Sequence, residues 1–392
     1  MRASYDVVVL GAGIVGAACA LELARAGMSV GIIERDAVGG GATAAGMGHI
    51  VVMDDSSAQF ALTSYSQSLW SALALELPPS VEYTRCGTIW VAADEKEMTE
   101  VVRKMEFYST RGILAEILDS KALACAEPNL RGALAGGLLV SSDAVLYPPC
   151  AASYLLDQAS QRKAELILGR SAVKAANGRV LLDDRSEIAS PVIVNATGAL
   201  APELTPGIAV RKRKGHLIIT DRYPGFLHHQ LVELGYLKSA HSSTADSVAF
   251  NVQPRQTGQL LIGSSRQFDP EDAGRGSPSP GSSSIDRNIV AAMIERATEY
   301  MPGLASLSAI RVWSGFRAAT PDKLPLIGPT VDPSIFLATG HEGLGITTSL
   351  ATARLLADHL LGQCSPIPSG PYLPSRMSDK RTEIPAVETS HA

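Results

Sequence analysis

Residues 6–16 read Asp6-Val7-Val8-Val9-Leu10-Gly11-Ala12-Gly13-Ile14-Val15-Gly16, an apolar run followed at once by a G-x-G-x-x-G pattern. The run predicts a strand, and the residues after it predict a helix over 14–26 that ends before Gly27. In a dinucleotide-binding βαβ unit the first glycine permits a tight turn, the second lets the backbone reach a pyrophosphate, and the third lets helix pack on strand. The stretch therefore predicts such a unit at the start of the chain.

The residues that follow complete the unit. A second apolar run, 29–33, predicts a strand that delivers Glu34, whose carboxylate would accept hydrogen bonds from ribose hydroxyls. An acid at this position favours NAD or FAD over NADP, although Arg35 adjoins it. The Gly-rich stretch Gly39–His49 comes next and is too rich in glycine for a regular strand, while its alanine run could open a helix. We expect it to lie against the cofactor, the alternative being a flexible surface loop.

Composition narrows the class of protein. The 392 residues are 46% hydrophobic and 19% charged, which is typical of a globular protein of about two domains. A net charge of −5 gives no basic footprint for nucleic acid. The five cysteines stand singly, which predicts no disulfide framework and no metal site and favours the reducing cytoplasm. No stretch has the roughly 20 uninterrupted apolar residues that a transmembrane segment needs, and export is not expected.

The rest of the chain suggests a divided organisation. Residues 83–139 contain a strand and a polar helix and resemble an insertion, whereas 210–309 contain alternating runs that predict a mostly antiparallel sheet. Within 140–209, the strand 192–195 leads into Ala196-Thr197-Gly198, where a backbone could lie against a nucleotide. The Pro- and Gly-rich stretch 269–286 is a mobile lid or a tolerated insertion. Residues 364–392 are expected to be a poorly ordered tail.

A second glycine-rich turn lies near the C-terminus. The segment Arg311–Gly328 leads to a strand over 335–338, and Gly340–Ser349 then opens a helix that runs to about Leu361. A helix that begins after glycines offers unpaired N–H groups and a positive dipole end. Two such ends in one chain indicate a cofactor with two electron-rich parts.

Together these motifs resemble the D-amino-acid oxidase superfamily of FAD enzymes over residues 4–362. Within it the chain is similar to the glycine oxidase-like branch, and most closely to bacterial D-hydroxyproline dehydrogenases, through Gly41–His49, Lys214–Leu217 and Gly340–Ser349. The resemblance implies α/β plus α+β architecture, in which a Rossmann-like FAD-binding domain (1–82, 140–209 and 310–363) carries an inserted, mostly antiparallel β-sheet substrate domain (83–139 and 210–309).

The resemblance also implies how FAD would be held, without a covalent bond. The pyrophosphate would lie on the helix at Ile14, the ribose on Glu34, the adenine near Val173, and the isoalloxazine between the two glycine-rich turns. The implied cofactor residues are Gly11, Ala12, Gly13, Ile14, Val15, Gly16, Glu34, Arg35, Thr43, Ala44, Ala45, Gly46, Met47, Gly48, Val173, Ala196, Thr197, Gly198, Gly340, His341, Gly343, Leu344, Gly345, Ile346, Thr347 and Thr348.

By similarity, Arg317 matches the arginine that binds the substrate carboxylate in this superfamily. A planar guanidinium that grips both oxygens fixes the α-carbon for hydride transfer to flavin N5. The alternative is a structural ion pair with Asp322. The neutral histidines His49 and His341 are candidates to receive the amine proton, and each could instead be structural. Tyr236 and Gln253 could face the substrate, or could be ordinary sheet residues.

The chain departs from the glycine oxidase pattern at two places. It has Asn251 where that branch has Tyr, and Glu342-Gly343 where that branch has an Arg in the turn. We therefore expect oxidation of the Cα–N bond of a D- or secondary amino acid, best represented by cis-4-hydroxy-D-proline, with a pyrroline carboxylate as product.

Three alternatives remain. The chain could be an opine-, glycine- or sarcosine-type oxidase subunit that works with iron–sulfur partners, or an FAD-holding subunit without turnover of its own. A nicotinamide-linked reductase is disfavoured because there is no second G-x-G-x-x-G. An electron-accepting protein or quinone is an expected partner, which could associate a cytoplasmic enzyme with a membrane.

Overall fold

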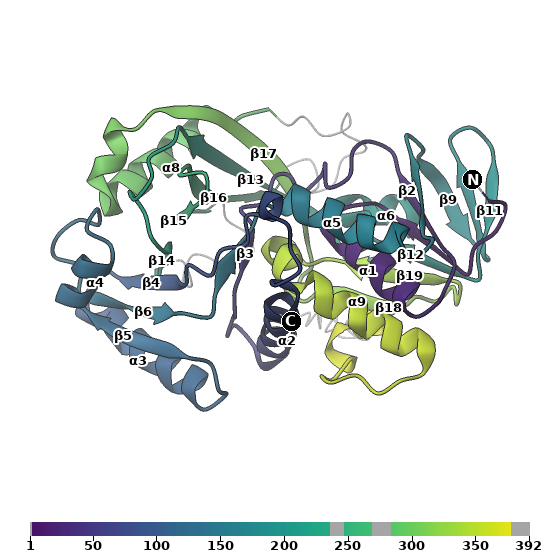
Figure 1. The fold of residues 1–392 in the computed structure, drawn as a ribbon, viewed down its shortest axis with the longest axis horizontal. Helices are drawn as coiled ribbons and strands as arrows, with labels where there is room; N and C mark the ends of the chain where they lie inside the picture. The colour runs from purple at the N-terminus through teal and green to yellow at the C-terminus, as the bar shows by residue number, and fades with distance from the viewer. Residues whose placement is uncertain (1, 236–246, 269–283, 378–392) are drawn as a thin grey trace, which may run out of the picture.

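A computed structural model describes residues 2–235, 247–268 and 284–377. The chain forms two halves, each built on its own large sheet (Figure 1). Two long strands of the second half, β13 (Arg211–Thr220) and β17 (Ala309–Ala319), run side by side toward the first half (Figure 1). This arrangement brings one end of the second sheet close to the edge of the first.

A six-stranded sheet forms the first half, in the order β18-β19-β12-β1-β2-β8. Its strands are β1 (Val7–Leu10), β2 (Val30–Glu34), β8 (Glu165–Leu168), β12 (Val192–Asn195), β18 (Leu326–Pro329) and β19 (Ile335–Thr339). All neighbours are parallel except β18 and β19. The chain adds strands on one side of β1 and later on the other, so the strand order reverses between β1 and β12. In open sheets of this kind, ligands bind beyond the carboxyl ends of the strands at the reversal.

The first sheet is buried on both faces, which explains the unbroken apolar sequence of β1. Val7 and Val9 pack into the core formed with the helices, whereas Val8 and Leu10 pack against a small sheet on the other face. The helices are α1 (Ile14–Arg25), α2 (Ser57–Leu73), α5 (Pro148–Ser160) and α9 (Gly345–Leu361). The small sheet contains β9 (Ala172–Ala176), β10 (Arg179–Leu182) and β11 (Glu187–Ala189), and the short α6 (Ala201–Leu204) follows β12.

An eight-stranded sheet forms the second half, in the order β17-β13-β16-β15-β14-β4-β6-β5. Besides β13 and β17, its strands are β4 (Thr88–Ala92), β5 (Ala115–Asp119), β6 (Gly136–Val140), β14 (Gln230–Glu233), β15 (Ser247–Pro254) and β16 (Leu260–Phe268). All its pairs are antiparallel except β14 with β4. The expected mostly antiparallel sheet is therefore confirmed.

In the described part of the chain, three helices cover the second sheet. Helices α4 (Ser120–Ala126) and α8 (Arg287–Tyr300) contribute to one core, and α3 (Glu95–Ser109) contributes to another. The predicted polar helix is α3; it begins after Asp94, whose side chain accepts a hydrogen bond from the N–H of Glu97. The short strands β3 (His49–Ile50) and β7 (Ala144–Val145) pair between the two halves. No helix among the described residues is both long and apolar enough to cross a membrane.

Two sequence predictions need correction. The tail was expected to lack order from residue 364, yet Tyr372 is buried and donates to the carbonyl of Ala58, and Arg376 forms a forked ion pair with Asp322. Proline and serine abolish periodicity but do not prevent packing, so the prediction is wrong for 364–377, while 378–392 lie outside the described residues. The other correction concerns β17, which was assigned to the cofactor domain from residue 310 but pairs along its length with β13 of the eight-stranded sheet.

Candidate cofactor and substrate site

Three backbone turns meet at the carboxyl edge of the first sheet. Gly11, Ala196–Gly198 and Gly340 directly follow the adjacent strands β1, β12 and β19. Gly11 has a φ of +97°, and a Cβ there would lie 2.9 Å from the carbonyl oxygen of Ala196. A Cβ on Gly16 would lie 2.0 Å from the carbonyl oxygen of Gly11. These glycines are required by close backbone approach, as the spacing predicted.

Two helices point uncapped N-termini into this edge. The N-cap residues are Gly13 for α1 and Leu344 for α9, and neither makes a side-chain capping bond in the described structure. No acidic residue lies in the first turn of either helix. One donor of α1 has a partner, because the N–H of Ile14 donates to Oγ1 of Thr43 at 3.0 Å. The remaining N–H groups and the helix dipoles suit an anionic ligand.

Glu34 lies beside the first turn as expected for a ribose-binding acid. Its Oε2 accepts from the N–H of Ala12 at 2.8 Å, and its Oε1 accepts from the N–H of Asp36 at 2.9 Å. A carboxylate has about four lone-pair positions, so two ribose hydroxyls can still donate to it. Arg35 is turned toward Asp36, 2.9 Å away. The glycine cradle, the two helix ends and Glu34 together fit an extended dinucleotide such as FAD.

The turn after Glu34 is packed against the second sheet. Residues 38–45 form successive turns, so the alanine run does not open a helix as it could have done. A Cβ on Gly315 of β17 would lie 2.3 Å from Cβ of Ala45, and a Cβ on Gly263 of β16 would lie 3.0 Å from the sulfur of Met47. Nε2 of Gln253 donates to the carbonyl of Met47 at 2.8 Å. The side chain of Gln253 thus holds the backbone of the segment at Met47 in place.

The other predicted cofactor residues are spread over several elements. Val173 lies on β9 with 53% of its surface exposed, and Ala196 is buried beside Gly11. Within α9, Thr347 donates to the carbonyl of His49, and Thr348 donates to that of Leu344. The rest lie in the turns after β12 and β19, in the glycine-rich segment after Glu34, or in the first turns of α1 and α9: Val15, Ala44, Gly46, Gly48, Thr197, Gly198, Gly343, Gly345 and Ile346.

Arg317 lies on β17 where the second sheet meets these turns. Its Nη1 donates to the carbonyl of Ser265 at 2.9 Å, and a Cβ on the cross-strand Gly215 would lie 2.3 Å from the same nitrogen. Gly215 therefore leaves the space that the guanidinium occupies. The alternative partner Asp322 pairs with Arg376, and Arg317 makes no ion pair with it. Burial lowers the pKa of Arg317, Glu342 opposes this shift and Arg213 adds to it.

The two candidate histidines have different surroundings. Nε2 of His341 lies 2.9 Å from Oγ1 of Thr352 within buried structure, and burial lowers its pKa to about 3. Burial also lowers the pKa of His49 to about 4; its backbone hydrogen bond with Gly343 opposes the shift, and Arg317 and Arg266 add to it. Nδ1 of His49 is buried and has no hydrogen-bond partner among the described residues. Both histidines are therefore neutral at pH 7, and Arg317 and Arg266 further disfavour the charged form of His49.

Sequence reasoning missed two further arginines and an acid beside Arg317. Arg213 of β13 and Arg266 of β16 approach the carboxylate of Glu342, with nitrogen–oxygen distances of 2.9 Å and 3.8 Å. Their side chains are 3% and 13% exposed, and that of Glu342 is 10% exposed. We call Arg213, Arg266 and Arg317 with Glu342 the arginine cluster. The available signal was the basic run 211–214 at the start of an apolar strand, since strand alternation turns some of its side chains inward.

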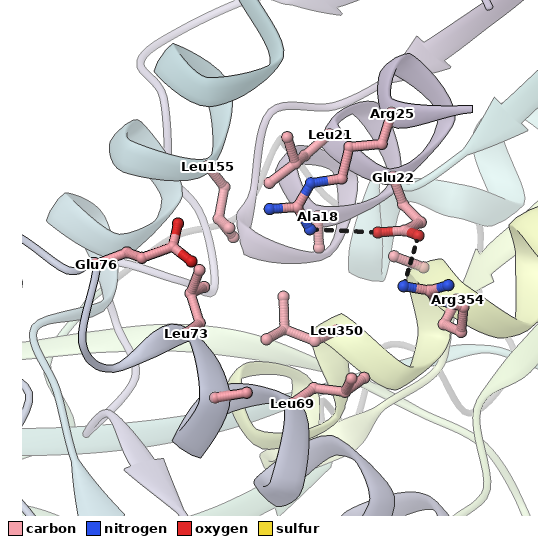
Figure 2. Close-up of a pocket in the computed structure, with 12 residues that line it drawn as sticks. Ala18, Leu21, Glu22, Arg25, Leu69, Leu73, Glu76, Leu155, Leu350 and Arg354 are labelled. Carbon is pink, nitrogen blue, oxygen red and sulfur yellow. Dashed lines mark ion pairs between the residues drawn. The ribbon is translucent and has the colours of Figure 1, made fainter. Parts of the chain in front are cut away.

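Two cavities in the described part of the chain lie outside the turns. One, of about 230 Å³, is lined by residues 55, 56, 59 and 321–324. The other, of about 180 Å³, lies along the C-terminal half of α1, where Glu22 forms ion pairs with Arg25 and Arg354 (Figure 2). The second cavity is remote from the glycine turn at the other end of α1. Of the remaining predictions, Tyr236 and most of loop 269–286 lie outside the described residues.

Comparison with known proteins agrees with this geometry. Residues 6–359 match the family model DAO, described as FAD dependent oxidoreductase. Hydrogen cyanide synthase subunit HcnC of Pseudomonas aeruginosa is 26% identical, over 98% of this chain and 99% of that protein. Glycine oxidase of Geobacillus kaustophilus is 28% identical, over 91% of this chain and 93% of that protein. The crystal structure of the glycine oxidase from Geobacillus kaustophilus superposes with a TM-score of 0.83 at 24% identity, covering 96% of this chain and 99% of that one.

Proposed function

The chain belongs to the DAO family of FAD-dependent oxidoreductases, and from this we propose that it oxidises the Cα–N bond of a D- or secondary amino acid. The observation that carries the proposal is the placement of Arg317. Its guanidinium lies beside Gly343 in the second glycine-rich turn, and Asp322, the acid considered as its structural partner, pairs with Arg376 instead. A guanidinium so placed can take a substrate carboxylate next to the cofactor edge.

FAD, when bound, supplies the two-electron acceptor for a hydride that leaves the α-carbon. The protein then has to fix the substrate and keep its amine neutral. Arg317 would bind the carboxylate in a fork, which leaves the α-carbon few orientations. His49, neutral at pH 7, would accept a hydrogen bond from the amine at its buried Nδ1. Loss of the hydride and the amine proton leaves an imine.

For the substrate itself we propose cis-4-hydroxy-D-proline as the first compound to test. The support is the resemblance of the glycine-rich turns to those of D-hydroxyproline dehydrogenases. Asn251, which replaces the Tyr of the glycine oxidase pattern, is 7% exposed and has a buried Oδ1 with no partner among the described residues, so a hydrogen-bond acceptor is available at this position. The cytoplasm remains the proposed location on the strength of the unpaired cysteines.

The experiment is anaerobic mixing of purified holoenzyme with cis-4-hydroxy-D-proline, D-proline, sarcosine and common D-amino acids while flavin absorbance is followed. We expect the oxidised flavin bands to bleach with at least one of these compounds. If flavin is present and none bleaches it, the proposed reaction is wrong.

A second candidate is an oxidase subunit that acts only in a hetero-oligomer. The observation that favours it is the match to HcnC over nearly the full length of both chains, because that protein is by name a subunit. Iron–sulfur partners would be separate chains, since the five cysteines here are scattered. Full activity of the chain purified alone would count against this candidate. A subunit without turnover is disfavoured by Arg317 at the cofactor edge.

A further inference from the structure

The end of the described chain forms a strap that is hydrogen-bonded at both ends. Residues 370–377, which we call the C-terminal strap, contain two short 3₁₀ helices, η6 (Gly370–Tyr372) and η7 (Pro374–Met377). Tyr372 is 1% exposed, and its hydroxyl donates to the carbonyl of Ala58 at 2.6 Å. Because Ala58 lies in the first turn of α2, one end of the strap is fixed to that helix.

The other end of the strap holds the turn between β17 and β18. Nε and Nη2 of Arg376 donate to the two carboxylate oxygens of Asp322, at 2.8 Å and 3.1 Å. Nη2 also donates to the carbonyl of Leu324 at 2.7 Å. The side chains of Arg376 and Asp322 are 15% and 21% exposed, so the fork is largely shielded from water. A shielded bidentate pair restrains its partner more strongly than an exposed ion pair does.

The turn has little support of its own. It reads Thr320-Pro321-Asp322-Lys323-Leu324-Pro325, and its two prolines have no N–H group to donate. Lys323 has a φ of +62°, a left-handed conformation that is uncommon for a residue other than glycine. Residues 321–324 also line the cavity of about 230 Å³, so few neighbours hold the turn on that side. Arg376 thus supplies hydrogen-bond donors that the turn lacks.

The turn lies between two parts of the candidate site. It begins three residues after Arg317, at the end of β17. A Cβ on Gly340 would lie 2.6 Å from Cγ2 of Thr320, so the turn packs directly on the start of the second glycine-rich turn. A Cβ on Gly343, in that same glycine-rich turn, would lie 3.8 Å from Nε of Arg317. A shift of the turn after β17 would therefore reach Arg317 both along the strand and through the second glycine-rich turn.

We propose that Arg376 is a positioning residue for the reaction, and that the C-terminal strap keeps the guanidinium of Arg317 aligned with the substrate carboxylate. The inference rests on the proposed function, since it assumes that Arg317 binds that carboxylate. Arg376 acts through the turn and not on the substrate itself. A misplacement of about 1 Å can cost roughly 100-fold in rate, so a small movement of the turn is enough to be measured.

A double-mutant cycle between Arg376 and Arg317 tests the inference. Anaerobic flavin reduction by the best substrate is measured for wild-type holoenzyme, Arg376→Gln, Arg317→Lys and the double variant, at a temperature at which all four are folded. We expect Arg376→Gln to keep its flavin and to lower the apparent second-order rate constant roughly tenfold. Arg317→Lys should lower it roughly 100-fold. The double variant should be slower than Arg317→Lys by less than about twofold, because aligning a fork that is already lost has no further effect.

Arg296→Gln is the matched control. Arg296 of α8 also forms a forked ion pair, with Glu233 of β14, through Nε at 3.2 Å and through Nη2, but this pair joins elements of the second half. Both Arg376→Gln and Arg296→Gln should lower the melting temperature, whereas only Arg376→Gln should slow flavin reduction. Equal slowing in both would overturn the inference, because it would show a general effect of losing a shielded ion pair.

Three other results would also overturn the inference. They are wild-type kinetics in Arg376→Gln, loss of flavin from that variant, and independent losses that make the double variant roughly 1000-fold slower than wild type. If Arg376→Gln does not fold, Arg376→Lys, which keeps the charge and loses the fork, takes its place in the cycle and should slow reduction roughly threefold. Unchanged kinetics in Arg317→Lys would instead reject the proposed function.

Discussion

The two sides of the candidate site offer different kinds of groups to a ligand. At the edge of the first sheet, Gly11, Gly13 and Gly16 and the start of α9 present backbone N–H groups without a charged side chain in either first helical turn. On the second sheet, the arginine cluster presents charge at the ends of long side chains from three strands. A backbone site depends on the absence of side chains, whereas the cluster depends on their identity. The two sides should therefore respond to different mutations.

The largest expected effect lies on the backbone side. In Gly16→Ala the new Cβ would lie 2.0 Å from the carbonyl oxygen of Gly11, so the turn after β1, where we expect the pyrophosphate to bind, cannot keep its shape. We expect the purified variant to retain less than about a tenth of the wild-type flavin, since a backbone clash of this kind costs more than 1–3 kcal/mol. Flavin absorbance per protein chain measures it. Gly132→Ala, where a Cβ meets nothing within 4 Å, is the control and should keep its flavin.

An intermediate effect is expected from two glycines that pair across β13 and β17, because each contacts a different side of the site. A Cβ on Gly215 would meet the guanidinium of Arg317, while a Cβ on its partner Gly315 would meet Ala45 in the glycine-rich turn after Glu34. We expect Gly215→Ala to lower kcat/KM roughly tenfold with flavin content unchanged, because the guanidinium has to move by about 1 Å. Gly315→Ala should instead weaken flavin retention. Identical phenotypes for the two variants would contradict the division.

The last expected effect is on stability, and it concerns Asp143, which binds the segment after His49. Val52, three residues after His49, donates its N–H to Oδ1 of Asp143, which also accepts from Nε2 of Gln67. Burial raises the pKa of Asp143 to about 7, and its hydrogen bonds only partly oppose this. The native state therefore binds more protons than the unfolded state between about pH 4 and 7, so this group's contribution to stability falls as the pH rises through that range.

Asp143→Asn removes this proton uptake while keeping an acceptor oxygen. The variant should gain stability relative to wild type at pH 8, by about 1–4 kcal/mol, and gain much less at pH 5. Urea unfolding at the two pH values measures the difference. If the difference in stability between variant and wild type were the same at both pH values, Asp143 would not titrate between them. That result would contradict the raised pKa of its buried carboxyl group.

The difference between the sides also explains what could be predicted from sequence. Gly11, Gly16 and Glu34 form a local pattern with fixed spacing, so fold and cofactor could be inferred before the structure. Arg213, Arg266 and Glu342 are brought together by strand register and a distant turn, and only Arg317 was found, through family resemblance. The tail was mispredicted because the packing of Tyr372 on Ala58 leaves no periodic signal. The arginine cluster and the packing of the tail are both determined by contacts between residues far apart in the sequence, which local propensity does not reveal.

The central claim is that backbone holds the cofactor and Arg317 holds the substrate carboxylate. It is tested most directly by measuring flavin content and anaerobic reduction kinetics together in Arg317→Lys, which keeps the charge and loses the fork. We predict wild-type flavin content and a loss of roughly 100-fold in the apparent second-order rate constant for flavin reduction by the best substrate. Loss of flavin, or unchanged reduction kinetics, would contradict the account.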